Sequence, residues 1–231
     1  MDRLAYKGIK PHAVLGYCFG EFAAAIVAGI LSENAVIDIL VRRAAALDRI
    51  EGNMLNVFEE ERTIRRLLLR MAAPPNIAIF AGLKHTVLSG SIEQISAAQK
   101  LFQAEGIRCK LVPSFIPFHS SVMDSVVETL RFPAVNPKQA RCMYISGLLG
   151  IPINGENLGA AYWLRHMRDP LQFFTAMQYI RKEFPDKPLY DCGPGTDLTS
   201  IITRYGWENV SFYGGTKTNF SVDVNPIKKG L

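Results

Sequence analysis

The chain has 231 residues, of which 48% are hydrophobic and 20% are charged, a composition that excludes a disordered protein and suffices for one sizeable core. Its net charge of +5 suits an acidic partner, but the basic residues form short scattered pairs without interleaved aromatics, so no nucleic-acid binding is expected. Four widely separated cysteines, no zinc-ligand spacing and no apolar run long enough to cross a bilayer predict a reducing, cytoplasmic location, no metal site and no membrane contact.

Hydrophobic periodicity predicts a chain of the α/β class. The elements expected in the first half are, in order, a strand over 13–16, helices over 21–28 and 33–48, a strand over 54–58, a helix over 60–71, a strand over 76–80 with a hairpin return over 86–88, a helix over 92–105 and a strand over 107–111. Those expected in the second half are a helix from about 120, a strand over 143–146, helices from about 162 and 173, a strand over 189–192 and a helix over 196–204.

The order of elements between residues 53 and 112 resembles a ferredoxin-like fold. We therefore expect a small subdomain at residues 53–112, inserted into a larger α/β subdomain that residues 1–52 and 113–218 form together. Residues 219–231 show no periodicity and are expected to be a tail.

A glycine stands two residues before and two residues after Cys18, in the sequence Gly-Tyr-Cys-Phe-Gly at residues 16–20. This spacing is typical of a nucleophile elbow, in which the nucleophile takes a strained backbone conformation and the flanking glycines let neighbouring backbone pass closely. The helix that follows is expected to point its N-terminal N–H groups at the sulfur and to lower the pKa of the thiol. The pattern alone leaves a second interpretation, in which Cys18 is a small buried apolar residue.

Four motifs, in the order that a known family has, bear on this choice. They are Gly-Tyr-Cys-Phe-Gly-Glu at 16–21 with the helix that follows, Pro-Phe-His-Ser-Ser-Val-Met at 117–123, Asp-Pro-Leu-Gln-Phe at 169–173 and Leu-Tyr-Asp-Cys-Gly-Pro-Gly at 189–195. Together they resemble the acyltransferase family of fatty-acid and polyketide synthesis, the malonyl-CoA:acyl-carrier-protein transacylases. The resemblance covers nearly all of the chain and implies a hydrolase-like α/β core with a short parallel sheet.

The resemblance also implies a mechanism, the ping-pong transfer of an acyl group of malonyl or starter type from CoA to an acyl carrier protein. Cys18 would carry the acyl group as a thioester, and His119 would be the base. The backbone N–H of Phe19 would hold the oxyanion, and the backbone carbonyl of Gln172 would steady His119. No resident cofactor is implied, because the CoA and phosphopantetheine thioesters are substrates. The alternative interpretation of His119 is that it caps the helix that follows it.

Three residues are expected to bind the acyl group. Arg43 stands where the family has the arginine that holds the malonyl carboxylate. Its alternative is a solvated helix face or a salt bridge to Asp48 or Glu51. Tyr17 and Phe118, which neighbour the nucleophile and the base, are the other two. The remaining histidines match no motif and are expected at surface or structural positions: His12, His85 and His166.

The sequence departs from the family pattern in three ways. Cys18 replaces a serine and Tyr17 replaces a histidine, which keeps a nucleophile, and Ala81 replaces an asparagine near the acyl group. Only seventeen residues precede Cys18, where the family has a longer segment with a second oxyanion donor, so we expect either a fragment or a second chain that supplies this segment. Two other functions stay open: a hydrolase that releases acyl groups from carrier proteins to water, and a non-catalytic docking domain.

Overall fold

The computed structural model of the chain describes residues 7–212 apart from 134, 196, 205, 208 and 209. The chain divides into two compact units, one of residues 10–185 and the other of residues 1–9 and 186–231. In the second unit, β7 (Leu189–Asp191) pairs in parallel with β8 (Val210–Phe212), and α9 (Asp197–Arg204) connects them. The predicted tail at 219–231 lies outside the described residues.

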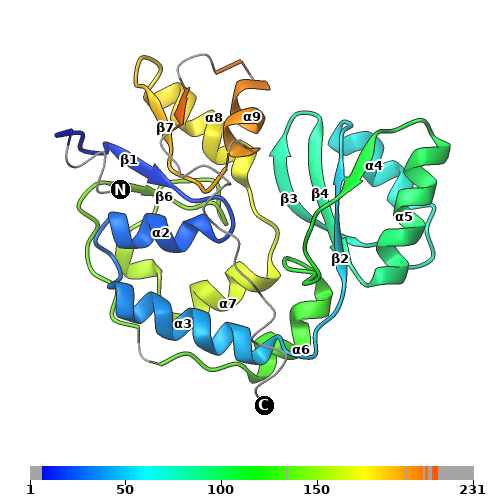
Figure 1. Cartoon of the computed structure of the whole chain (residues 1–231), viewed down its shortest axis with the longest axis horizontal. Helices are drawn as coiled ribbons and strands as arrows, with labels where there is room; N and C mark the ends of the chain where they lie inside the picture. The colour runs from blue at the N-terminus through cyan, green and yellow to red at the C-terminus, as the bar shows by residue number, and fades with distance from the viewer. Residues whose placement is uncertain (1–6, 134, 196, 205, 208–209, 213–231) are drawn as a thin grey trace. The chain divides into compact units, whose positions relative to one another are not determined.

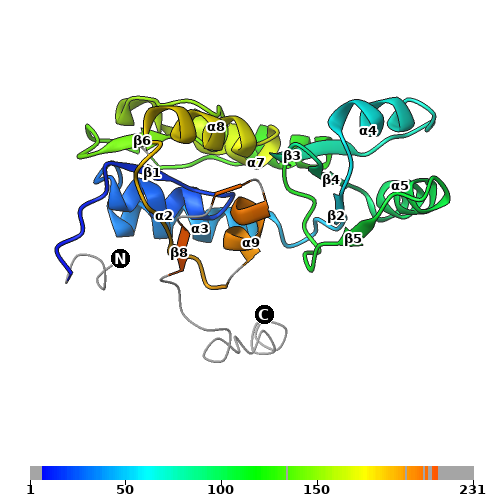
Figure 2. The ribbon, with the colours of Figure 1, turned by 90° about the horizontal axis from the view of Figure 1, so that it is seen from above.

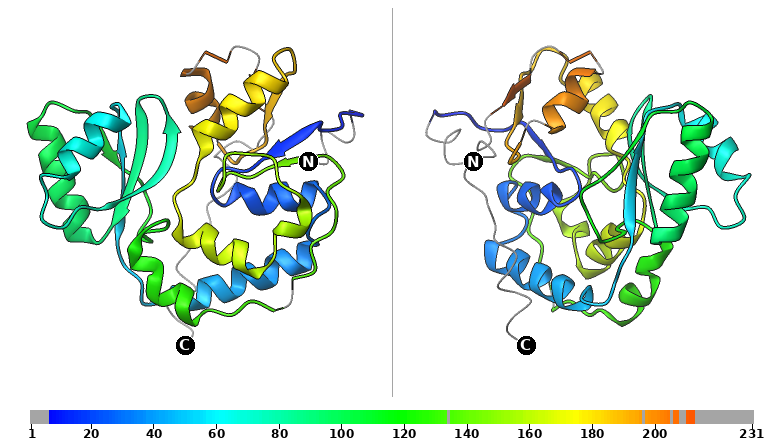
Figure 3. Two further views of the ribbon diagram at one scale, coloured as in Figure 1. Left: turned by 180° about the vertical axis from the view of Figure 1, so that it is seen from behind. Right: turned by 45° about the vertical axis from the view of Figure 1, so that its right-hand side comes forward.

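The nucleophile motif belongs to the α/β part of residues 10–185. There β1 (Ala13–Leu15) pairs in parallel with β6 (Met143–Ile145). The helix α2 (Gly20–Val27) lies beside this pair of strands, and α3 (Glu33–Ala46) and α7 (Ala160–Arg168) lie further out on the same side (Figures 1 and 3). The predicted α/β class and the short parallel pairing are therefore confirmed.

The segment from residue 53 to residue 111 forms an antiparallel sheet with two helices. Its elements, in the predicted β-α-β-β-α-β order, are β2 (Asn53–Val57), α4 (Glu61–Leu68), β3 (Asn76–Gly82), β4 (His85–Gly90), α5 (Ile92–Ala104) and β5 (Cys109–Leu111). The strand order is β3-β4-β2-β5. Both helices pack on the same sheet through a core that includes Leu55, Ile64 and Phe102, and Figure 2 shows them at the end of the unit far from β1. The sheet clusters with the rest of residues 10–185, so a separate subdomain at 53–112 stays a prediction.

The remaining elements of this unit are a short 3-10 turn at Ser121–Met123 that leads into α6 (Asp124–Thr129), a second such turn at Gly155–Asn157, and α8 (Phe173–Glu183). The helix starts follow from capping. Ser32 accepts a hydrogen bond from the N–H of Ala35 at 3.2 Å, and Ser91 and Gln94 form a capping box. Within the described part of the chain, no helix combines the length and the apolar character needed to cross a membrane.

A short segment between α7 and α8 pairs with the outer strand of the antiparallel sheet. The N–H of Phe80 in β3 donates to the carbonyl of Leu171 at 2.9 Å, and the N–H of Leu171 donates to the carbonyl of Ala78 at 2.8 Å. Because β3 is the outer strand of its sheet, Leu171 occupies an edge that would otherwise present unpaired N–H and C=O groups. The segment that follows α7 is thereby fixed by main-chain bonds.

Gly16 is required where β1 passes close to the start of α2. A Cβ atom added to it would lie 2.1 Å from both the backbone N and the Cα of Glu21. A Cβ atom added to Gly20 would meet no atom within 4 Å. The expectation that the flanking glycines allow close backbone approach is thus correct for Gly16 and wrong for Gly20, which begins a helix in open space.

Candidate active site

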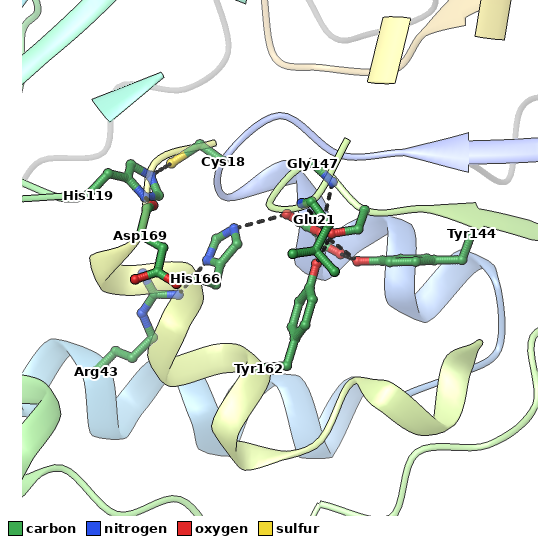
Figure 4. A network of polar contacts seen from close by, with 11 residues as sticks. Cys18, Glu21, Arg43, His119, Tyr144, Gly147, Tyr162, His166 and Asp169 are labelled. Atoms are coloured by element: carbon green, nitrogen blue, oxygen red, sulfur yellow. Dashed lines mark hydrogen bonds and ion pairs between the residues drawn. The ribbon is translucent and has the colours of Figure 1, made fainter. Parts of the chain in front are cut away.

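Cys18 and His119 face each other although they are 101 residues apart in the sequence. The sulfur of Cys18 lies 3.4 Å from Nε2 of His119, at hydrogen-bonding distance (Figure 4). Their backbone φ angles are 52° and 60°, and they are the only non-glycine residues with positive φ in the described part of the chain. Such strain persists only where the surrounding structure enforces it, and it is typical of functional residues. The predicted elbow at Cys18 is confirmed, and the strain at His119 is an addition that the sequence did not indicate.

The last turn of α7 and Asp169, the residue directly after it, hold His119 at two points. The backbone N–H of His119 donates to the carbonyl of Met167 at 2.8 Å, and Nδ1 lies 3.0 Å from the carbonyl oxygen of Asp169. A carbonyl oxygen only accepts, so the proton of the neutral ring is on Nδ1. Nε2 is then a lone-pair acceptor directed at the Cys18 thiol, which is the arrangement that a general base requires.

The predicted role of Gln172 is wrong, because the carbonyl that contacts the ring belongs to Asp169. The carbonyl of Gln172 accepts from the N–H of Ala176 at 3.0 Å, and this is the first helical bond of α8. The N–H of Gln172 donates to the carbonyl of Gly147 at 2.8 Å. Gln172 therefore anchors the segment after Asp169 without contacting His119.

Burial sets the charge state of both groups. It raises the pKa of the Cys18 thiol to about 11, although the Arg43 charge and the Phe19 backbone N–H lower it, and the Glu21 charge raises it further. Burial also lowers the pKa of His119 well below its ordinary value, helped by electrostatic interaction with His166 and Arg43 and opposed by the hydrogen bond to Asp169. The expected lowering of the thiol pKa is therefore wrong, because desolvation outweighs the Arg43 charge and the Phe19 N–H. The resting pair is a neutral thiol beside a neutral imidazole.

The high thiol pKa predicts how Cys18 alkylation depends on pH. A neutral thiol is a poor nucleophile, so the rate of reaction with iodoacetamide should rise about tenfold per pH unit between about pH 7 and about pH 10, as the thiolate fraction grows. Peptide mapping by mass spectrometry measures the rate at Cys18, with the exposed Cys192 as an internal comparison. A plateau below about pH 9 would show that the thiol is activated rather than suppressed.

Aromatic residues surround the pair. The Phe19 N–H lies close enough to the sulfur to lower the thiol pKa, and its use as an oxyanion donor stays a prediction. The Phe19 ring is 49% exposed and meets the buried Phe118 ring edge-on at 5.8 Å. Tyr17, half-buried, packs edge-on against Phe173 at 4.8 Å. Tyr17 and Phe118 thus lie beside Cys18 and His119, and their contact with a substrate stays a prediction.

Arg43 points inward from α3. It is 2% exposed, and its guanidinium lies between 5.1 and 5.3 Å from the ring centres of Phe19, Phe22 and Phe118. One of its terminal nitrogens lies 3.4 Å from Nδ1 of His166, and its Nε has no hydrogen-bond partner among the described residues. Burial lowers the pKa of Arg43 to about 10, so it stays a cation at neutral pH.

A solvated helix face and a salt bridge to Asp48 or Glu51 are both wrong as interpretations of Arg43. The side chain is buried, and none of the ion pairs formed by the described residues includes it. A buried guanidinium that lacks a carboxylate partner has unused capacity for an anion.

Two further residues complete the site, and the sequence did not identify them. Glu21 is fully buried, and its Oε1 accepts from the Tyr144 hydroxyl at 3.1 Å, the Gly147 N–H at 3.0 Å and the Tyr162 hydroxyl (Figure 4). Its other oxygen lies 3.2 Å from Nε2 of His166, an ion-pair contact without well-aligned hydrogen-bond geometry. Burial raises the pKa of both tyrosines, which keeps them as protonated donors to Glu21. The sequence signal that could have identified Glu21 is the position of this acid directly after the turn at Cys18. The structure shows that its side chain is buried.

His85 has the structural position that was expected. It is 4% exposed in β4, its Nε2 lies 2.8 Å from the Asn56 side-chain oxygen, and its ring stacks on Phe58. His166, expected at a surface or structural position, is fully buried and lies 5.7 Å from the His119 ring.

Comparison with known proteins adds a family and a fold. A family model described as the acyl transferase domain matches residues 1–188. Hispidin synthase of Neonothopanus nambi is 30% identical over 223 residues, which are 90% of this chain and 13% of that protein. The non-reducing polyketide synthase adaA of Aspergillus niger is 34% identical over 176 residues, which are 72% of this chain and 10% of that protein. This chain spans about a tenth of the length of these relatives.

Solved structures of the same fold include the acyltransferase domain from module 8 of the salinomycin polyketide synthase. It matches with a TM-score of 0.83 at 22% identity, over 92% of this chain and 52% of that one. MCAT from Streptococcus pneumoniae matches with a TM-score of 0.77 at 18% identity, over 92% of this chain and 72% of that one.

Proposed function

Because the chain belongs to the acyl transferase domain family, we propose that it transfers an acyl group from CoA to an acyl carrier protein through a thioester on Cys18. The observation that carries this proposal is the 3.4 Å contact between the Cys18 sulfur and a His119 nitrogen whose partner nitrogen is held by a carbonyl. The relatives that are polyketide synthases support a place in polyketide or fatty-acid biosynthesis.

In the first half-reaction, Nε2 of His119 takes the thiol proton as the sulfur of Cys18 attacks the thioester carbonyl of acyl-CoA. The Phe19 N–H stabilises the oxyanion of the tetrahedral intermediate. The intermediate collapses, the bond to the CoA sulfur breaks, and the protonated His119 returns its proton to that sulfur. In the second half-reaction the carrier's phosphopantetheine thiol gives its proton to His119 and attacks the acyl-enzyme carbonyl. The bond between the acyl carbon and the Cys18 sulfur then breaks, and His119 returns the proton to that sulfur.

The position and charge of Arg43 favour a malonyl-type acyl group, which carries a carboxylate, over a neutral starter group as the substrate. Its buried guanidinium is close enough to Cys18 to lower the thiol pKa, and the described residues offer it no carboxylate. A carboxylate on the acyl group would accept two parallel hydrogen bonds from it, whereas a neutral acyl group would leave the cation without a counter-charge.

The reaction as proposed needs no resident cofactor, since both thioesters are substrates. An acidic carrier protein is the expected partner of a chain with a net charge of +5. A second oxyanion donor from another segment or a second chain, and a cytoplasmic location, remain part of the proposal.

The test is the intact mass of the protein after brief incubation with malonyl-CoA, acetyl-CoA or a longer acyl-CoA, for the wild type and Cys18→Ala. We expect an adduct of the acyl mass on the wild type alone, which disappears when a carrier protein is added and reappears on the carrier. Release to water without transfer would instead indicate the hydrolase. The absence of any Cys18-dependent adduct would leave the docking domain and overturn the proposal.

A further inference from the structure

The contact between Arg43 and His166 fixes the protonation pattern of a ring that the proposed chemistry does not use. A guanidinium only donates hydrogen bonds, so the Nδ1 atom of His166, 3.4 Å from Arg43, is the acceptor and carries a lone pair. In the neutral ring the proton is then on Nε2, which lies 3.2 Å from Glu21 (Figure 4). A carboxylate only accepts, so the two contacts require the same tautomer.

Glu21 is held in a single place. Three donors meet its Oε1 from different elements: Tyr144 in β6, Tyr162 in α7 and the Gly147 N–H after β6. Gly147 leaves room for the carboxylate, because an added Cβ atom there would lie 3.1 Å from Oε2, and the Glu21 backbone is packed against Gly16. A fixed carboxylate 3.2 Å from Nε2 restrains the ring that presents Nδ1 to Arg43, through a charge contact and not through an aligned hydrogen bond.

The rest of the Arg43 environment does not orient it. Three aromatic rings attract its charge but have no acceptor atoms, and its Nε has no partner among the described residues. His166 also separates the charges. If Glu21 contacted Arg43 directly, its negative charge would neutralise the guanidinium. A neutral imidazole between them instead offers Arg43 a hydrogen-bond acceptor and supplies no counter-charge.

We propose that Glu21 and His166 are positioning residues that orient the Arg43 guanidinium and thereby set the preference for acyl groups that carry a carboxylate. This inference rests on the proposed acyl transfer, and it extends substrate selection from Arg43 to the two residues behind it. It predicts that the acceptor atom of residue 166, and not the volume of its side chain, determines the preference.

Two variants separate the acceptor from the volume. His166→Asn can place an amide oxygen near the position of Nδ1 but leaves a cavity, whereas His166→Leu keeps the approximate volume and has no acceptor. The measured quantity is the ratio of the Cys18 acylation rates with malonyl-CoA and acetyl-CoA. Because both rates come from one preparation, the folded fraction cancels. We expect the ratio to fall about tenfold or more in His166→Leu, and to be largely kept in His166→Asn.

A wild-type ratio in His166→Leu, or an equal fall in both variants, would overturn the positioning role while the proposed acyl transfer stands. A second readout needs no acyl transfer: free malonate should slow the alkylation of Cys18 by iodoacetamide in the wild type and in His166→Asn, but not in His166→Leu. Equal protection in all three proteins would overturn the positioning role even if no acyl-CoA reacts, which is the outcome that overturns the proposed function.

Discussion

Replacing His119 with alanine is expected to slow acylation of Cys18 by about 10³- to 10⁴-fold at neutral pH. Without a base, only the thiolate reacts, and a thiol with a pKa of about 11 is ionised in about one molecule in 10⁴ at pH 7. The thiolate fraction increases as pH rises, so the variant should gain about tenfold in rate per pH unit while the wild type changes less. Quenched-flow intact mass between about pH 6 and about pH 9 measures both rates.

The matched control is His12→Ala, which removes an exposed histidine of the same compact unit and should leave the rate unchanged. A loss in His119→Ala that is the same at every pH would contradict the role of His119 as a base and indicate a structural role instead. A loss below about threefold would remove His119 from the mechanism.

Replacing Arg43 with alanine is expected to lower acylation by malonyl-CoA by about 10²-fold or more, because truncating one partner of a buried charged contact costs that much. Acylation by acetyl-CoA should fall less. It still falls, because the Arg43 charge lowers the thiol pKa and its loss leaves the sulfur harder to ionise. The ratio of the two rates, from the same mass measurement, isolates the carboxylate contact.

Arg42→Ala is the matched control, since Arg42 is the adjacent exposed arginine on the same helix. An unchanged ratio in Arg43→Ala, or the same change in Arg42→Ala, would contradict carboxylate binding by Arg43. The first result would also favour neutral starter groups as the substrates.

Local patterns sufficed for the residues that sit within a single motif. The turn at Cys18 follows from glycine spacing, and the position of His119 just before a helix start follows from the residues around it. The identity of the carbonyl behind His119 did not follow. It depends on the chain leaving α7 in an extended conformation at Asp169 and then pairing with β3 at Leu171, a contact with a strand about 90 residues earlier.

The sequence could not predict how deeply the side chains of the site are buried. A helix N-terminus behind Cys18 is visible in the pattern, but the desolvation that raises the thiol pKa depends on everything packed around it. The same holds for Glu21 and His166, which are 145 residues apart and look like an exposed acid and an unassigned histidine until the fold brings them together.

The main-chain pairing between Leu171 and β3 lets the position of His119 stay fixed while side chains on the antiparallel sheet change. The bonds that fix the segment after Asp169 join backbone atoms of Ala78, Phe80 and Leu171, so they do not depend on the side chains at these positions. Exposed side chains of the antiparallel sheet can therefore change, and with them whatever that sheet presents to other molecules, without breaking the main-chain bonds behind His119.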